Sequence, residues 1–155
     1  MLRVQSLIAG QYLGTATNDN ATAGNIGEFV SATVAAGSAI TCTTSVSQNI
    51  TSIVLTAGDW DVTGTASFTY GATTSMTNQA ASISSTSVTM GAQGSGFDFE
   101  SPAIVPTATS DATWVLPTTR FSLSAASTTI YLVTRNSFTV STMLAYGLLR
   151  ARRIR

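Results

Sequence analysis

Residues 59–70 alternate strictly between two kinds of side chain, and this pattern constrains the fold more than any other feature of the sequence. One set is apolar or glycine: Trp60, Val62, Gly64, Ala66, Phe68 and Tyr70. The other set is polar: Asp59, Asp61, Thr63, Thr65, Ser67 and Thr69. Because successive side chains of a β-strand point to opposite faces, the period of two predicts a half-buried strand of about 12 residues.

Seven other segments show weaker alternation or short apolar runs: 26–34, 38–44, 49–56, 78–89, 120–125, 128–134 and 142–150. The run 128–134 is almost continuously apolar, which is typical of a strand covered on both faces. No window shows the spacing of an amphipathic helix. About eight short strands separated by Gly, Asn and Ser predict an all-β fold, a sandwich or a barrel built as one domain over residues 26–155.

Two regions fall outside the predicted strands. Residues 1–25 contain an apolar stretch followed by the turn-rich segment 18–25, and we interpret them as an anchoring arm with a linker. The apolar residues of the arm are Leu2, Val4, Leu7, Ile8, Tyr12 and Leu13. Residues 91–118 contain several Gly and Pro residues and predict a long irregular connection, a kind of segment that is often functional or lies against a partner.

The composition excludes much chemistry. The chain has no His and no Lys, so it has no Ser-His-Asp or Cys-His nucleophile, no His-bound zinc, no Schiff base and no Walker-type loop. A single cysteine, Cys42, excludes an internal disulfide, and we expect it to act as a small buried hydrophobe. The net charge of +0 gives no general attraction to nucleic acid or membrane. We therefore expect a protein that is not an enzyme and uses no cofactor.

The low charge also bears on assembly. Charged residues make up 9% of the chain, against about 25% in an ordinary soluble domain. Exposed strand edges are usually protected by Lys or Pro, and this chain has no Lys and few Pro. Burial of faces and edges in a symmetric oligomer is the simplest remedy. The alternative is a monomer that its 27 Thr and 20 Ser residues keep soluble.

Two carboxylate pairs are candidate sites. Asp59 and Asp61 share one strand face, so they suit a Ca²⁺ ion or an acid–base pair, or they are a solvated strand start. Asp98 and Glu100 have the same spacing within the long connection. They suit an exposed loop that contacts a metal ion or a glycan, or they belong to an ordinary polar loop.

The carboxyl-terminal segment 150–155 is rich in arginine, with Arg150, Arg152, Arg153 and Arg155. Nucleic-acid contact is one interpretation, but the zero net charge and the lack of interleaved aromatic residues disfavour it. Bidentate contact with carboxylates of a neighbouring subunit is the second, and a solvated tail is the third.

Several segments together resemble small virion proteins of tailed bacteriophages and prophages, which serve as capsid decoration or cement proteins and as tips of phage fibres. The segments that carry the resemblance are GEFV at 27–30, SIVLTAGDWDVTG at 52–64, ASIS at 81–84, TTIYLV at 128–133 and AYGLLRARR at 145–153. The resemblance covers about residues 24–155. It implies a jelly-roll sandwich that assembles as a homotrimer, similar to the trimeric heads of the complement C1q and tumour necrosis factor families, and it implies no catalytic residues.

The resemblance leads to two functional hypotheses. The first is a homotrimeric capsid decoration protein, made in the host cytoplasm and placed on the outer surface of the particle, with the arm anchored on the major capsid protein or another virion protein. The second is a fibre or spike tip in which the region of Asp98 and Glu100 binds host surface glycan. A start at Met1 with only a short arm favours the first. A glycan-hydrolysing enzyme with a carboxylate pair is a third and weaker hypothesis.

Overall fold

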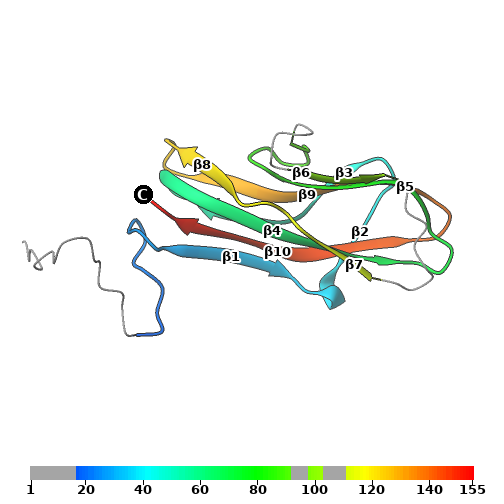
Figure 1. Ribbon diagram of the computed structural model, residues 1–155, viewed down its shortest axis with the longest axis horizontal. Helices are drawn as coiled ribbons and strands as arrows, with labels where there is room; N and C mark the ends of the chain where they lie inside the picture. The colour runs from blue at the N-terminus through cyan, green and yellow to red at the C-terminus, as the bar shows by residue number, and fades with distance from the viewer. Residues whose placement is uncertain (1–16, 92–97, 103–110) are drawn as a thin grey trace, which may run out of the picture.

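Ten β-strands make up the computed structural model, which describes residues 17–91, 98–102 and 111–155 (Figure 1). The strands are β1 Phe29–Val34, β2 Ile40–Thr41, β3 Ser47–Leu55, β4 Gly58–Tyr70, β5 Ser75–Ser84, β6 Asp98–Pro102, β7 Asp111–Val115, β8 Thr119–Leu123, β9 Thr128–Thr139 and β10 Met143–Arg153. Helical structure in the described residues is limited to one 3₁₀ turn, η1 Ala36–Ser38, so no described helix is long enough to cross a membrane. The predicted all-β class is confirmed.

The strands pair as a nested set. β1 pairs with β10, β3 with β9, β4 with both β7 and β8, and β5 with β6, all antiparallel. Pairing of β10 with β4 and of β9 with β5 joins these pairs into two sheets. Sheet A has the order β1-β10-β4-β7, and in it β8 also pairs with β4 and β2 with β10. Sheet B has the order β3-β9-β5-β6. This is a long hairpin rolled into two packed sheets, a jelly-roll-like sandwich as predicted.

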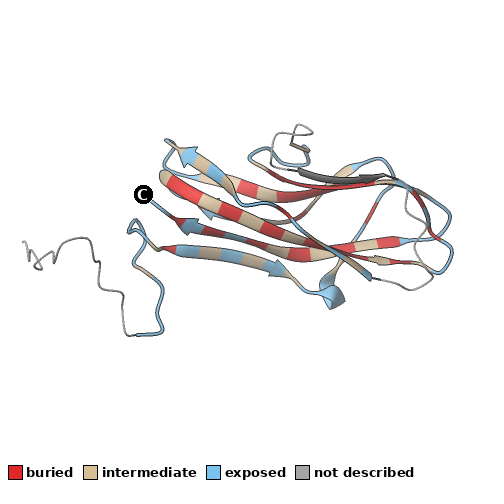
Figure 2. Cartoon of the chain, in the orientation of Figure 1, coloured by how far each residue is buried: buried red, intermediate tan, exposed pale blue. Residues whose placement is uncertain are grey.

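The core lies between the two sheets and uses the predicted face of β4. Trp60, Val62 and Phe68 are fully buried, and they pack in one cluster with Ile130 and Leu132 of sheet B. Figure 2 shows buried positions alternating with partly exposed ones along β4 and β10. The orientation of β4 predicted from its alternation is confirmed.

Part of the outer face of sheet B is covered by the connection that follows β5. Gly91 donates its N–H to Ser82 Oγ (2.8 Å) on β5, and Val88 donates its N–H to Asn49 Oδ1 (2.8 Å) on β3. Val133 on β9 is fully buried although it alternates with the core residues Ile130 and Leu132. The prediction that residues 128–134 are covered on both faces therefore holds in the middle of β9.

The structure corrects the prediction for residues 91–118. This segment contains β6, paired with β5, and β7, paired with β4, so it is not one irregular connection. Gly and Pro residues flank both strands in the sequence and hide their short alternation. The segment 38–44 is also less regular than predicted, because η1 occupies its start and β2 has only two residues.

Candidate interaction surface

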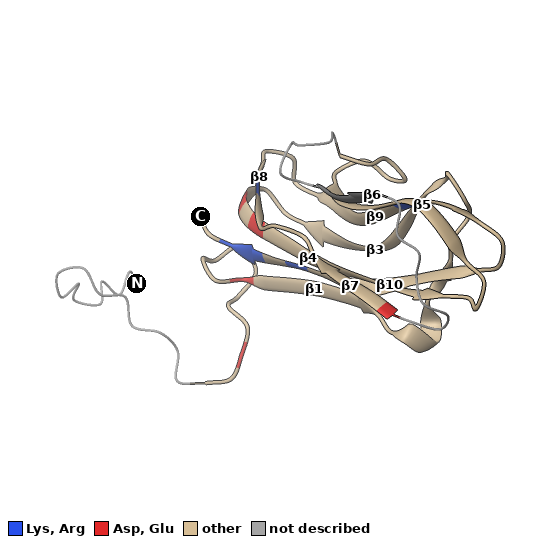
Figure 3. Cartoon of the chain, turned by 45° about the vertical axis from the view of Figure 1, so that its right-hand side comes forward, with Lys and Arg blue, Asp and Glu red and all other residues tan. Residues whose placement is uncertain are grey.

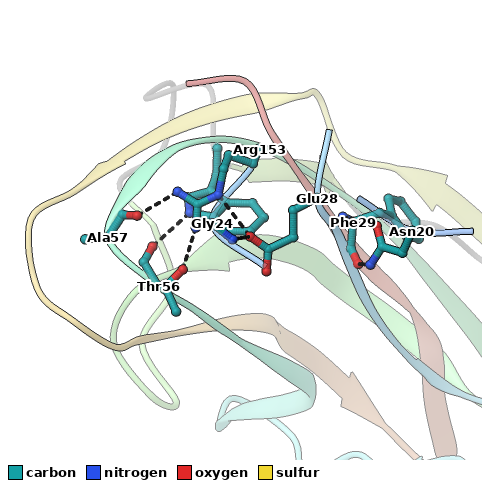
Figure 4. A network of polar contacts seen from close by, with 8 residues as sticks. Asn20, Gly24, Glu28, Phe29, Thr56, Ala57 and Arg153 are labelled. Atoms are coloured by element: carbon teal, nitrogen blue, oxygen red, sulfur yellow. Dashed lines mark hydrogen bonds and ion pairs between the residues drawn. The ribbon is translucent and has the colours of Figure 1, made fainter. Parts of the chain in front are cut away.

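A buried ion pair joins the end of β10 to the segment before β1 (Figure 4). Arg153 Nε donates to Glu28 Oε2 at 2.9 Å, and Arg153 Nη1 donates to the carbonyl oxygen of Ala57 at 2.7 Å. The guanidinium also lies 4.3 Å from the ring centroid of Trp60, which is a cation–π contact. The backbone N–H of Gly24 donates to the same Glu28 oxygen at 2.8 Å. This hydrogen bond, followed by the Arg153 interactions, lowers the pKa of Glu28.

A second ionic group surrounds Asp59 at the start of β4. Arg120 and Arg155 each place a guanidinium nitrogen near Asp59 Oδ2, at 2.7 and 2.6 Å. The hydroxyl of Ser122 and the guanidinium of Arg120 lower the pKa of Asp59 to about 2. Asp59 is buried, so it is not the solvated strand start that we considered. Within the described residues, no group of three or more potential ligands gathers around a metal position, so the structure gives no support to a Ca²⁺ site at Asp59 and Asp61.

The pairing of Asp59 predicts how stability depends on acid. A carboxyl with a folded pKa of about 2 and an unfolded value of about 3.9 stabilises the fold above pH 4, and this contribution is lost as the pH falls through 2. We therefore expect the melting temperature of wild type to fall between pH 4 and pH 2 more steeply than that of Asp59→Asn. Calorimetry of both proteins across this range measures the difference. Parallel curves would contradict the assignment.

The four carboxyl-terminal arginines split into two kinds. Arg153 is 4% exposed and bound within its own chain, so the predicted subunit contact is wrong for this residue. Arg155 binds Asp59 of the same chain, although its side chain remains 76% exposed. Arg150 and Arg152 are exposed on the outer face of sheet A and form no ion pair within the described residues. Their proposed contact with a neighbouring subunit stays a prediction.

Between Arg150 at one end and Asp111 at the other, the outer face of sheet A carries no charged side chain among the described residues. Three partly exposed residues of β10, Leu144, Tyr146 and Leu148, form its central row. The strands β1, β4 and β7 surround this row with hydroxyl and apolar side chains: Ser31, Thr33, Thr63, Thr65, Ser67, Thr69, Thr113 and Val115. Figure 3 shows most charged residues of sheet A near the C-terminus, with a further acidic residue on β7 at the opposite end of the sheet. We call this uncharged region the sheet A surface.

A groove of about 750 Å³ lies at the charged end of the sheet A surface. The segment Asn18, Asp19, Asn20 and Ala21 forms one wall, and Phe29, Asp61, Thr63, Arg150 and Arg152 are among the residues that form the rest. Arg152 lies opposite Asp61 in the β10–β4 register. With amides, hydroxyls and both signs of charge, the groove suits hydrogen bonding to a polar partner rather than attraction of an ion.

The structure describes only some of the remaining residues that we predicted as sites. The arm residues Leu2, Val4, Leu7, Ile8, Tyr12 and Leu13 lie outside the described residues. Asp98 and Glu100 lie on β6, opposite Ser82 and Ala80, so they belong to a strand rather than to the exposed loop that we predicted. Cys42 is buried, and burial raises the pKa of its thiol to about 11, which agrees with an unreactive small hydrophobe.

Sequence reasoning missed the roles of Glu28, Arg120 and Asn20. Glu28 and Arg153 are 125 residues apart in the chain, and no local pattern indicates that they meet. Comparison with known proteins adds no identification, because no protein family, curated protein or solved structure matches this chain.

Proposed function

We propose that this protein is a non-enzymatic structural protein of a bacteriophage particle, a homotrimer that decorates the capsid shell and holds neighbouring shell subunits together. The sheet A surface is the observation that carries the self-assembly part of this proposal. The location on a phage particle and the trimeric state rest on the sequence resemblance. A tip module of a fibre or spike that binds host glycan is the alternative function.

The central row of the sheet A surface has the character of an interface core. Leu144, Tyr146 and Leu148 are only partly buried in the single chain, and their neighbours are hydroxyl side chains that cost little to desolvate when hydrogen-bonded. Aromatic residues are enriched in interface cores, and charged residues are depleted there. A stable contact needs roughly 800 Å² from each partner.

The self-assembly part is tested by placing a charge in the central row. We expect Tyr146→Arg to abolish the homotrimer, because three guanidinium groups would be buried without partners. Ser52→Arg is the matched control, because Ser52 is exposed on β3 of the other sheet. Light scattering coupled to size-exclusion chromatography gives both masses. A Tyr146→Arg protein with the mass of wild type would contradict the use of this surface.

The location is tested by the copy number in purified particles. A decoration protein is expected at a copy number comparable with that of the main shell subunit, because its sites repeat over the whole shell. A fibre or spike tip is expected in far fewer copies. Quantitative mass spectrometry of intact particles decides between them, and a small copy number with binding of purified protein to host polysaccharide would support the alternative.

The arm supplies a further test of attachment. We expect a protein that lacks residues 1–13 to remain a folded homotrimer and to be lost from particles, because the apolar arm is the predicted contact with the shell. Circular dichroism and light scattering check the fold and the mass, and particle composition checks attachment. Normal occupancy by the truncated protein would remove the arm from the proposal.

A further inference from the structure

The strand β1 is an edge of sheet A that lacks the usual protection. It pairs with β10 on one side, and no described strand pairs with its other side. Its sequence, FVSATV, contains no charged residue, proline or glycine. Such an edge presents unpaired N–H and C=O groups and is a template for another strand.

Backbone hydrogen bonds fix which residues of β1 direct their N–H and C=O groups away from sheet A. Arg153 donates its N–H to the carbonyl oxygen of Glu28 at 2.9 Å and accepts from the N–H of Gly27 at 2.9 Å, so the carbonyl of Glu28 faces β10 and the next residue, Phe29, faces away from it. Hydrogen-bonded pairs alternate along an antiparallel ladder, so Val30, Ala32 and Val34 direct their backbone groups to β10. The backbone groups of the alternate residues point away from the sheet.

The first outward position is already occupied by a side chain that imitates a strand. The N–H of Phe29 donates to Asn20 Oδ1 at 2.8 Å, and Asn20 Nδ2 donates to the carbonyl oxygen of Phe29 at 2.7 Å (Figure 4). The next outward positions are Ser31 and Thr33. Their outward backbone groups have no partner among the described residues, which leaves two adjacent pairing positions open on this edge.

We propose that β1 pairs antiparallel with β1 of a second copy about a two-fold axis through Ala32. In this register Ser31 lies opposite Thr33 of the second copy, and Thr33 lies opposite Ser31 of the second copy, so each open position meets an open position. Residue 35 of the second copy would lie opposite Phe29, but β1 ends at Val34. Asn20 therefore keeps its place, and the open positions are self-complementary.

Burial supports the same contact. Val30, Ala32 and Val34 point to the core but remain only partly buried, because they lie at the rim of the sandwich. A second β1 covers this rim with the same three residues. The contact does not use the central row of the sheet A surface. If the proposed function holds, the contact links one homotrimer to the next, and this consequence alone rests on the proposed function.

Disulfide trapping tests the register. Ala32 lies opposite itself in the proposed pair, at a non-hydrogen-bonded position with Cα atoms about 4.5 Å apart, within the range of a disulfide. We expect Ala32→Cys in a Cys42→Ala background to give a covalent dimer under mild oxidation. Ser52→Cys in the same background is the control, because Ser52 is exposed on β3. Equal or lower cross-linking at position 32 than at position 52 would overturn the proposal.

A proline variant separates loss of pairing from loss of the fold. The N–H of Ser31 is not used in the ladder with β10, so Ser31→Pro is compatible with an edge strand. We expect it to keep the melting transition and to abolish cross-linking of Ala32→Cys. Persistent cross-linking in the folded double variant would contradict pairing through β1.

The outcomes also separate this proposal from the proposed function. In the Tyr146→Arg background, we expect cross-linking at position 32 to persist, with dimers as the largest species. Dimers in the wild type as well would reject the homotrimer and leave the β1 contact standing. Homotrimers without cross-linking at position 32 would reject only the β1 contact.

Discussion

Trp60→Ala is expected to lower the free energy of unfolding by about 3–5 kcal/mol, the usual cost of truncating a large aromatic residue in a core. Trp60 is fully buried at the start of β4, and its Nε1 donates to the carbonyl oxygen of Thr56 at 2.9 Å. Its ring also lies beneath the guanidinium of Arg153. Truncation therefore leaves a cavity and removes the cation–π contact of a buried charge.

Urea unfolding monitored by circular dichroism measures this loss. Phe29→Ala is the matched control, because Phe29 is an aromatic residue that is 45% exposed on the same sheet. We expect the control to change the free energy of unfolding by less than about 1 kcal/mol. Similar losses in the two variants would show that Trp60 does not lie in the core.

Arg153→Met has the second largest expected effect. Removal of one partner of a buried ion pair leaves an uncompensated charge and costs about 3–5 kcal/mol. The side chains of Arg153 and Glu28 are 5% and 10% exposed, so water does not replace the lost partner fully. The substitution also removes the hydrogen bond to the carbonyl oxygen of Ala57. We therefore expect a clear fall in the urea midpoint.

A double-mutant cycle distinguishes loss of the ion pair from loss of packing. We expect Glu28→Gln combined with Arg153→Met to cost less than the sum of the two single substitutions, because the two side chains share one interaction. Arg150→Met is the control, because Arg150 is exposed on the same strand. Additive losses in the cycle would contradict a direct interaction.

The sequence predicted the elements whose alternation is regular and whose two faces meet different surroundings. In β4, Trp60 and Phe68 pack in the core while Thr63 and Thr65 lie on the sheet A surface. Apolar and polar residues therefore alternate in the sequence with a period of two. In β6 and β7 the paired stretch has only five residues, bordered by Gly and Pro, so alternation is too short to stand out.

The contacts between segments that are distant in the chain could not be predicted from the sequence. The four arginines of the carboxyl-terminal segment look alike in the sequence, yet Arg153 points into the sandwich and Arg152 points out. Their difference follows from the phase of β10, and the partner Glu28 follows from the pairing of β1 with β10. Neither is fixed by neighbours in the chain. The strand-like contact of Asn20 with Phe29 has the same origin.

The proposed homotrimer requires the sheet A surface to be buried between copies of the chain. Sedimentation velocity of the full chain at micromolar concentration tests it most directly, with Tyr146→Arg beside the wild type. We expect the wild type to sediment with three times 16.0 kDa, or with a multiple of this mass if β1 edges also pair, and the variant to lose the three-fold species. A wild-type protein that sediments as a single 16.0 kDa species would contradict it.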